Sequence, residues 1–301
     1  MKAWHLVEAN GANELRLVEI PQPTPQPHEV LVRVRANSLN YRDLMIAGGK
    51  YGPGINLPLV PLSDGAGEIA AAGEAVTLWK PGDRVAGTFF QRWETGPCKA
   101  EIFSSALGGA MNGMLAEYVA LSEDGVIAIP DHMSFEEAAT LPCAALTAWQ
   151  ALVTHGHVSA DQTVLLLGTG GVSIFGCQIA KMHGAKVVIT SGIDEKLVRA
   201  KSLGADETIN YRTHPAWDEE VMRITGGAGV HHALEVGGHD TFEKSLRALA
   251  MNGTVSVIGG VSGFSTSVQL RDILTKNALI RGIFVGNHDM FAAMNRSFSR
   301  H

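Results

Sequence analysis

The stretch TVLLLGTGGVS at residues 163–173 decides the fold class of this chain. A short run of apolar and β-branched residues breaks into glycines, and a helical pattern follows directly. This order predicts a strand, a tight turn and the start of a helix. Gly168 permits the sharp turn, and Gly170 and Gly171 let the backbone approach a pyrophosphate at the helix N-terminus. Ser173 replaces the third glycine of the G-x-G-x-x-G pattern with another small residue.

The residues after this turn continue the alternation of strands and helices. KVVIT at 186–190 predicts a second buried strand, and Glu207–Asn210 predicts a third. Further strands are predicted at Val230–Val236, Thr254–Ile258 and Leu279–Val285, with helical segments between them. Six parallel strands with intervening helices describe an α/β fold with a doubly wound sheet of the Rossmann kind.

The end of the second strand predicts which dinucleotide binds. An NAD-specific site places an acidic residue there, which accepts hydrogen bonds from the ribose hydroxyls. The chain has Ser191 and Gly192 instead, and Lys196 and Arg199 follow in the next helical segment. These cations favour a 2′-phosphate, so the sequence predicts NADP. Asp194 lies nearby and weakens this interpretation, and alternatively the two cations are solvated helix residues.

The composition is that of a globular protein long enough for two domains. The chain has 301 residues, of which 46% are hydrophobic and 18% charged. Its net charge of −6 argues against nucleic acid or an anionic membrane as a partner. Three widely spaced cysteines offer no disulfide framework, and the N-terminus has no apolar signal core, so a cytoplasmic protein is expected.

The N-terminal part differs from the rest of the chain in composition and in residue pattern. Residues 1–127 are rich in glycine and proline and carry short β-rich segments, which predict a small barrel-like domain. Residues 128–290 are expected to form the dinucleotide-binding domain. Residues 291–301 are expected to begin a helix that returns toward the first domain, with the remainder of that return absent. Ser134 and Glu137 have the spacing of a capping box and predict a helix start.

Several longer phrases resemble the medium-chain dehydrogenase/reductase superfamily over essentially the whole chain. They are ANSLNYRDLMIAGGKY (36–51), PLSDGAGEI (61–69), WKPGDRVAG (79–87), LPCAALTAW (141–149) and KSLGADETINY (201–211). Within the superfamily the chain resembles the zinc-independent NADPH:quinone oxidoreductase-like branch. The resemblance implies a GroES-like barrel domain before the Rossmann domain, an NADP-dependent oxidoreductase, and a homodimer in which residues 254–270 supply the sheet edge.

The residues predict that neither zinc site of the superfamily is present. A catalytic zinc needs about three ligands from Cys, His and Asp/Glu. Where the zinc alcohol dehydrogenases have a Cys and a His-Glu pair, this chain has Asn40 and Ser63–Asp64. Cys143 matches a third ligand but stands alone, and alternatively it is a small hydrophobe. The structural zinc lobe needs four cysteines, whereas residues 88–113 contain only Cys98.

The resemblance implies hydride transfer from NADPH to a quinone or an α,β-unsaturated carbonyl. Without zinc, a hydrogen-bond donor must stabilise the negative oxygen that develops. The catalytic candidates lie in an expected loop: Asn40 near the nicotinamide, Tyr41 as donor to the carbonyl oxygen, and Tyr51 as a pocket residue. Alternatively Asn40 caps a turn and Tyr41 belongs to the core, and a solvent proton relay would also serve.

The resemblance, and the rule that ligands bind beyond the carboxyl ends of parallel strands, give the other candidates. The expected cofactor-binding residues are Asn40, Thr147, Gly168, Thr169, Gly170, Gly171, Val172, Ser173, Ser191, Gly192, Lys196, Tyr211, Val236, Gly237, Gly259, Phe284 and Val285. Alternatively Thr147 is a buried helix residue and Tyr211 packs against the sheet. Two other functions stay open: an alcohol dehydrogenase-like oxidoreductase of the same fold, and a non-catalytic NADPH-binding or redox-sensing protein.

Overall fold

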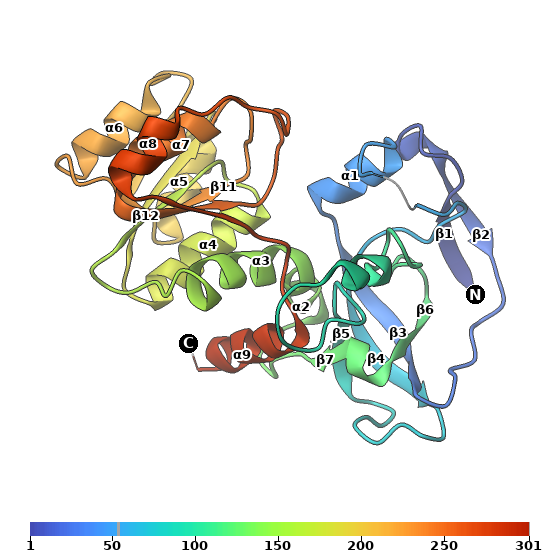
Figure 1. Cartoon of the computed structure of the whole chain (residues 1–301). Coiled ribbons are helices and arrows are strands. Elements are labelled where there is room, and N and C mark those ends of the chain that lie inside the picture. The colour runs from blue at the N-terminus through green and yellow to red at the C-terminus, as the bar shows by residue number, and fades with distance from the viewer. Residues whose placement is uncertain (53–54, 301) are drawn as a thin grey trace. The chain divides into compact units, whose positions relative to one another are not determined.

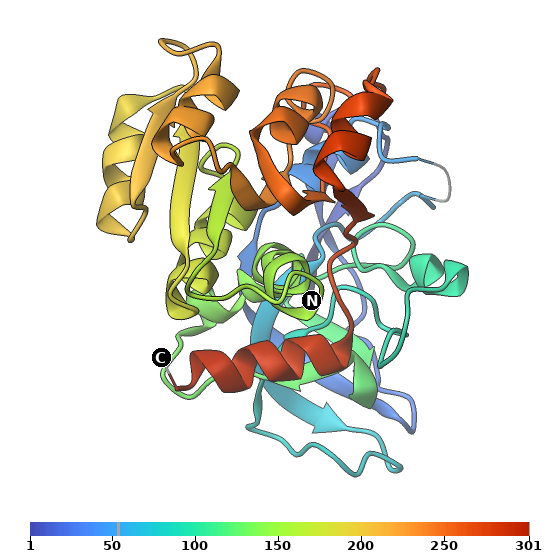
Figure 2. The same cartoon turned by 60° about the vertical axis from the view of Figure 1, so that its left-hand side comes forward.

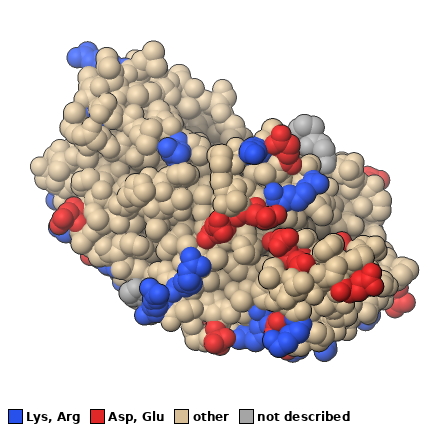
Figure 3. All heavy atoms as spheres, turned by 60° about the horizontal axis from the view of Figure 1, so that its bottom comes forward, with Lys and Arg blue, Asp and Glu red and all other residues tan. Residues whose placement is uncertain are grey.

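The computed structural model describes residues 1–52 and 55–300, and the chain divides into two compact units. Unit 1 comprises Met1–Leu146 and Val285–His301, and unit 2 comprises Thr147–Phe284. His301, the last residue of the expected returning helix, lies outside the described residues. Among the described residues, no helix combines the length and the apolar character needed to cross a membrane. Basic and acidic side chains are interspersed on the face drawn in Figure 3.

Unit 2 contains a parallel sheet with the strand order β10-β9-β8-β11-β12-β13. The strands are β8 (Thr163–Leu166), β9 (Lys186–Ser191), β10 (Glu207–Asn210), β11 (Val230–Glu235), β12 (Leu249–Val257) and β13 (Leu279–Gly282). The chain begins at β8, proceeds outward to β10, and then returns to β11 on the other side of β8. The predicted six-stranded, doubly wound sheet is therefore confirmed, with its reversal of strand order between β8 and β11.

Helices cover both faces of this sheet. They are α4 (Gly171–Met182), α5 (Asp194–Ser202), α6 (Trp217–Ile224), α7 (Phe242–Ala248) and α8 (Leu270–Lys276). Right-handed crossovers place α4 and α5 on one face and the other three on the opposite face. Figure 1 accordingly shows α6, α7 and α8 grouped together, and α7 contacts both of its neighbours. Leu165, Val188, Val221, Leu246 and Val255 are among the fully or almost fully buried side chains that join strands and helices in the core.

The expectation that residues 254–270 supply the sheet edge is wrong. β12 lies between β11 and β13 and is paired on both sides. The crossover through α8 adds one more strand in the same direction, so the free edge on this side is β13. Two apolar side chains of that edge strand, Leu279 and Ile280, are 45% and 38% exposed.

Unit 1 is built around an antiparallel sheet with the order β6-β3-β4-β5-β7. Its strands are β3 (Glu29–Ser38), β4 (Asp64–Ala72), β5 (Arg84–Gly87), β6 (Tyr118–Ser122) and β7 (Val126–Ala128), and β1 (Lys2–Leu6) pairs separately with β2 (Leu15–Glu19). This unit also contains the short 3-10 helices η1 (Ala12–Glu14), η2 (Ala100–Ser105) and η3 (Glu123–Gly125). Alternating residues such as Val30, Val32, Ile69 and Val85 form the core, which confirms the predicted β-rich N-terminal domain.

The helices of unit 1 are α1 (Tyr41–Ala47), α2 (Phe135–Ala138) and α9 (His288–Phe298). The predicted capping box is confirmed at α2: the Glu137 N–H donates to Ser134 Oγ at 3.2 Å, and the Ser134 N–H donates to Glu137 Oε2 at 2.8 Å. A helical run with π-type turns follows as η4 (Leu141–Ala145), α3 (Leu146–Trp149) and η5 (Gln150–Thr154). The boundary between the two units falls inside this run.

Unit 1 also contains residues after 127, the expected end of the first domain, and hydrogen bonds attach two of these later segments to it. The Cys143 N–H donates to Asp64 Oδ2 at 3.2 Å, which fixes η4 to the first residue of β4. Helix α9, red in Figure 2, joins the same unit because the Asn295 side chain donates to the Ala128 carbonyl at 2.9 Å. A Cβ built on Gly286 would lie 2.8 Å from Leu146 Cγ. The chain therefore leaves unit 1 and re-enters it at neighbouring points.

Candidate functional site

The glycine turn of unit 2 connects the end of β8 to the start of α4. Gly168 has a φ of +70°, a conformation that glycine adopts at little cost. Its N–H donates to Thr190 Oγ1 at 3.2 Å, and the hydroxyl of Thr169 lies 3.5 Å from that of Ser191. Residues at the end of β9 therefore hold the turn in place at the reversal point of the sheet.

The space in front of this turn is open. A Cβ built on Gly168 or on Gly170 would meet no other atom within 4 Å. Gly170 is the N-cap of α4, and no side chain caps the helix there. Free N–H groups and the positive end of the helix dipole suit a negatively charged pyrophosphate. The turn thus fits the diphosphate of a dinucleotide, with Gly171 and Val172 supplying the first helical turn.

Close packing between α4 and the sheet depends on two small residues. The Ser173 hydroxyl is buried and donates to the Leu167 carbonyl at 2.7 Å, so a serine is compatible with the position of the third glycine. Gly176 was missed by sequence reasoning. A Cβ there would lie 2.9 Å from Leu166 and 3.0 Å from Leu234, so α4 packs tightly against β8 and β11 at this residue.

The residues expected on the adenosine side gather at the ends of β9 and β10. Ser191 is 4% exposed, and its hydroxyl accepts from the Ile193 N–H at 3.4 Å. The phenol of Tyr211 lies over Gly192 and is 43% exposed, so it does not pack into the sheet core. Lys196 is exposed on α5.

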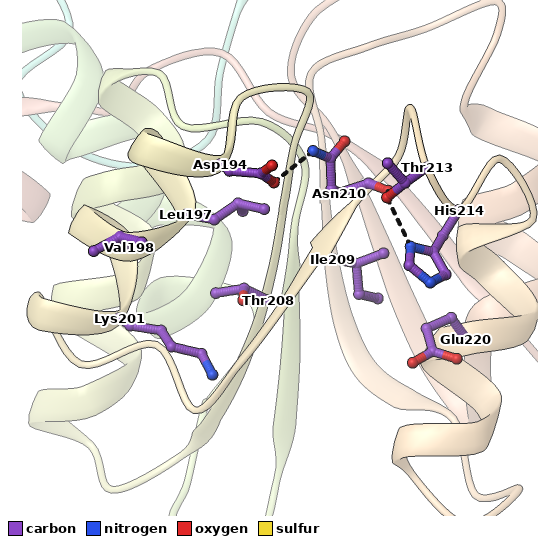
Figure 4. Close-up of a pocket in the computed structure, with 10 residues that line it drawn as sticks. All are labelled: Asp194, Leu197, Val198, Lys201, Thr208, Ile209, Asn210, Thr213, His214 and Glu220. Atoms are coloured by element: carbon purple, nitrogen blue, oxygen red, sulfur yellow. Dashed lines mark hydrogen bonds between the residues drawn. The ribbon is translucent and has the colours of Figure 1, made fainter.

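A groove of about 400 Å³ borders this region between α5, β10 and α6. Figure 4 shows Asp194 and Asn210 pointing toward each other at one end of the groove, where the Asn210 amide donates to Asp194 Oδ1 at 2.6 Å. Leu197, Val198 and Ile209 form its apolar lining. The groove was not predicted, because its walls come from segments whose packing is long-range.

A buried carboxylate shapes the turn after β11. Glu235 is fully buried and accepts hydrogen bonds from the N–H groups of Gly237 and Gly238, at 2.8 and 2.9 Å, and from the hydroxyl of Thr241 at 2.6 Å. It therefore fixes the backbone of the expected cofactor residues Val236 and Gly237. Sequence reasoning missed Glu235, since an acidic residue at a strand end does not reveal which N–H groups it will meet.

The remaining expected cofactor residues lie at several places. A Cβ on Gly259 would lie 3.0 Å from the Val236 carbonyl, so these two strand ends approach closely. Gly259 and Phe284 line a second cavity of about 370 Å³ in unit 2. Val285 belongs to unit 1 and has a φ of +56°. Thr147 is buried in α3, at the first residue of unit 2.

In unit 1, the expected loop from Asn40 to Tyr51 contains the helix α1 instead. The reason is local: Asn40 is its N-cap, and the Asn40 N–H donates to Asp43 Oδ2 at 2.7 Å. Tyr41 is the first residue of the helix and is 55% exposed, so it does not belong to the core. Tyr51 packs against the guanidinium of Arg42, whose carbon lies 5.0 Å from the ring centroid.

Asp64 lies at the centre of a buried polar cluster in this unit. It is fully buried, and its carboxyl accepts from the Ser63 hydroxyl at 2.7 Å and from the Cys143 N–H. Burial raises the pKa of Asp64 to about 7, which outweighs the opposing effect of the Ser63 hydrogen bond. Burial also raises the pKa of Asp43. The buried Asn40 side chain interacts with Asp64 and opposes the effect of burial on its pKa, as Ser63 does.

The donor set of this cluster does not fit a zinc ion. Burial, and secondarily the Asp64 carboxyl, raise the pKa of the Cys143 thiol well above its usual range. Asp64 accepts hydrogen bonds through both oxygens, and Ser63 beside it offers a hydroxyl, which is not a usual zinc ligand. Within residues 1–52 and 55–300, no three His, Cys, Asp or Glu side chains are grouped so that they could hold a metal.

Two family models match the chain, one in each half. Residues 26–131 match the alcohol dehydrogenase GroES-like domain, and residues 171–300 match the zinc-binding dehydrogenase model. A zinc-type alcohol dehydrogenase-like protein of Schizosaccharomyces pombe is 45% identical over 295 residues, which cover 95% of this chain and 85% of that protein. Human quinone oxidoreductase is 30% identical, with coverage of 94% and 80%.

Solved structures share the same architecture. A putative alcohol dehydrogenase from Sinorhizobium meliloti has a TM-score of 0.93 at 41% identity, covering 99% of this chain and 88% of the other. Quinone oxidoreductase from Escherichia coli, solved in complex with NADPH, has a TM-score of 0.84 at 26% identity, with coverage of 100% and 87%.

Proposed function

Because this chain belongs to the quinone oxidoreductase-like branch of the medium-chain dehydrogenase/reductase superfamily, we propose that it transfers hydride from NADPH to a quinone or an α,β-unsaturated carbonyl without zinc. The observation that carries this proposal is the open glycine turn at the N-terminus of α4, which has room and free N–H groups for a diphosphate. When bound, the dinucleotide supplies the hydride.

The preference for NADPH rests on the end of β9. Ser191 is buried with its hydroxyl engaged, so no carboxylate stands there to bind two ribose hydroxyls or to repel a 2′-phosphate. Two structural relatives support this choice: the E. coli quinone oxidoreductase holds NADPH, and a 2-octenoyl-CoA carboxylase reductase holds NADP. In this proposal Gly168–Ser173 bind the diphosphate, and Gly192, Lys196 and Tyr211 line the adenosine side.

Polarisation of the acceptor falls to residues of unit 1. Tyr41 has an exposed phenol at the start of α1, and we assign it the hydrogen bond to the acceptor oxygen as negative charge develops there. The buried Asn40 side chain interacts with the Asp64 carboxyl, and we assign its amide to orient a ligand. Tyr51 packs on Arg42 and therefore lines the site rather than donating a proton. The acceptor takes up one hydride and one proton.

A second candidate function is favoured by the names of other relatives. The S. pombe and S. meliloti proteins are called alcohol dehydrogenases or alcohol dehydrogenase-like. An alcohol dehydrogenase of this fold would oxidise alcohols with NADP⁺, and a redox-sensing protein would bind NADPH without turnover.

The test combines binding, turnover and metal content. We expect quenching of tryptophan fluorescence by NADPH, oxidation of NADPH by 1,4-benzoquinone or an enone, and activity that survives a chelator in protein with no zinc by elemental analysis. Loss of activity with EDTA and its recovery with zinc would contradict the zinc-free proposal. Oxidation of alcohols without reduction of quinones or enones would favour the second candidate. Binding without any turnover would favour the sensor.

We further propose that a second copy of the chain is the protein partner, through the edge strand β13. Within the described residues, one side of its backbone pairs with no other strand, and Leu279 and Ile280 are partly exposed along it. Light scattering after size-exclusion chromatography should give the mass of two chains, and Ile280→Lys should shift that mass toward one.

A further inference from the structure

Arg42 is a buried cation in the first turn of α1, directly after Tyr41. It is 8% exposed, whereas Tyr41 is 55% exposed. The Arg42 guanidinium lies over two aromatic rings, since its central carbon is 5.0 Å from the centroid of the Tyr51 ring and 4.6 Å from that of Phe89. A cation is attracted to the face of an aromatic ring at such distances. The first turn of α1 therefore exposes one side chain and anchors the next in the interior of unit 1.

The edge of the same guanidinium contacts a second segment of unit 1. Arg42 Nη1 donates to the Leu107 carbonyl at 3.0 Å, and the Leu107 N–H donates to the Phe89 carbonyl, also at 3.0 Å. Arg42 Nη2 lies against Gly109, where an added Cβ would be 2.8 Å from it. Arg42 thus ties the start of α1 to both aromatic rings and to the segment 107–109.

These contacts are an expensive way to stabilise a fold. The ion pair with Asp43 is loose, because Arg42 Nη1 lies 3.6 Å from Asp43 Oδ1. Within residues 1–52 and 55–300, the buried Arg42 atoms Nε and Nη2 have no hydrogen-bond partner. An apolar side chain could fill the same space without the cost of burying a charge. A guanidinium is, however, a rigid plane that stacks on rings and donates to a carbonyl at once, so it fixes direction as well as contact.

We infer that Arg42 is a positioning residue, which fixes the first turn of α1 and thereby holds the Tyr41 phenol where it can donate to the acceptor oxygen. This inference rests on the proposed function, which assigns that hydrogen bond to Tyr41. A displacement of about 1 Å in a catalytic group can cost a large factor in rate. Loss of Arg42 should therefore act on kcat and not on the binding of NADPH.

The kinetic test follows NADPH oxidation by 1,4-benzoquinone. Arg42→Met keeps an unbranched side chain without the planar cation and should lower kcat by about 10- to 30-fold, with the dissociation constant for NADPH within about 2-fold of wild type. Arg42→Lys should recover only part of this loss. Gly109→Ala leaves Arg42 in place but displaces its Nη2, so it should also lower kcat. Leu121→Ala, in the buried core of β6, is the control for a general loss of stability and should leave kcat within about 2-fold.

A double-mutant cycle tests whether Arg42 acts through Tyr41. In the Tyr41→Phe background the phenol hydroxyl is absent, so Arg42→Met should lower kcat by less than a further factor of about 3. Independent effects would instead multiply.

Hydrogen exchange of the α1 amides, measured without any ligand, is a readout that needs no turnover. Arg42→Met should accelerate exchange in α1 by at least about 10-fold and by more than Leu121→Ala does, while amides of unit 2 keep their wild-type rates.

The outcomes separate this inference from the proposal beneath it. Losses of kcat that multiply in the double variant would overturn it, as would an equal loss in Leu121→Ala or unchanged exchange of α1 in Arg42→Met. Coupled losses of kcat together with faster exchange confined to α1 would support it. If the wild type binds NADPH but reduces neither quinones nor enones, the proposed function fails, and the exchange rates alone decide whether Arg42 fixes α1.

Discussion

Replacing Asp64 with asparagine should stabilise the protein at alkaline pH. Asparagine has nearly the same shape as a protonated aspartic acid but never becomes a carboxylate. In the wild type, ionisation of Asp64 places a negative charge in a fully buried position, beside the raised-pKa carboxyl of Asp43. Arg42 Nη1 lies 3.6 Å from Asp43 Oδ1, but it donates its hydrogen bond to the Leu107 carbonyl.

The size of this effect follows from the difference between the pKa of Asp64 in the folded protein and its pKa in the unfolded chain. The folded state holds the Asp64 proton up to a pKa of about 7, whereas the unfolded chain releases it at 3.8. Between these values the folded state binds more protons, so the free energy of unfolding falls as the pH rises. At about 1.4 kcal/mol per pKa unit, complete ionisation of Asp64 lowers the free energy of unfolding by about 4 kcal/mol at most. About 2.5 kcal/mol of this decrease falls between pH 5 and pH 8.5.

The assay is urea unfolding of wild type and Asp64→Asn at pH 5 and pH 8.5, followed by tryptophan fluorescence. The advantage of the variant should grow by about 2.5 kcal/mol between the two pH values. Asp83→Asn is the control with the opposite sign, because the hydrogen bond from Lys80 lowers the pKa of Asp83 and its carboxylate is stabilising. An advantage of Asp64→Asn that is equal at both pH values would refute the reasoning.

Three other substitutions test separate parts of the molecule. Gly170→Val fills the open space before α4, so NADPH affinity should fall more than about 10-fold in fluorescence titrations while the melting temperature stays unchanged; normal affinity would contradict the assigned diphosphate position. Glu235→Gln replaces a charged acceptor of several hydrogen bonds and should lower the free energy of unfolding in urea by about 2–4 kcal/mol. A change below about 0.5 kcal/mol would mean that the turn after β11 is stable without this carboxylate. Tyr41→Phe should lower kcat for quinone reduction by about 10- to 100-fold with no change in the dissociation constant of NADPH; an unchanged kcat would remove Tyr41 from the mechanism.

Local patterns were enough to predict the sheet of unit 2. Apolar β-branched runs alternate with helical segments there, and right-handed crossovers join successive strands, which are neighbours in the sheet except for β10 and β11. The glycine turn was equally visible, because its chemistry is contained in a few consecutive residues. The capping box at Ser134 is local in the same sense.

The parts that sequence reasoning missed depend on contacts between distant segments. The helix α1 was hidden because Asn40 and Asp43 look like loop residues until their mutual capping is seen. Gly176 matters only because α4 packs against the sheet, where a Cβ would lie 2.9 Å from Leu166 and 3.0 Å from Leu234. Asp64 reads as a polar residue before a glycine, yet its environment is set by Cys143, which is 79 residues away along the chain.

The neighbouring positions of Leu146 and Gly286 make unit 2 an insertion within unit 1. During synthesis, β1 through η4 must wait for the whole of unit 2 before α9 can contribute Asn295 to the Ala128 carbonyl. A collapsed unit 2 holds its two ends close together, so it reduces the entropy cost of bringing α9 back compared with a flexible loop of the same length. Assembly is therefore favoured in an order in which unit 2 folds first and α9 then joins the β-rich segments of unit 1.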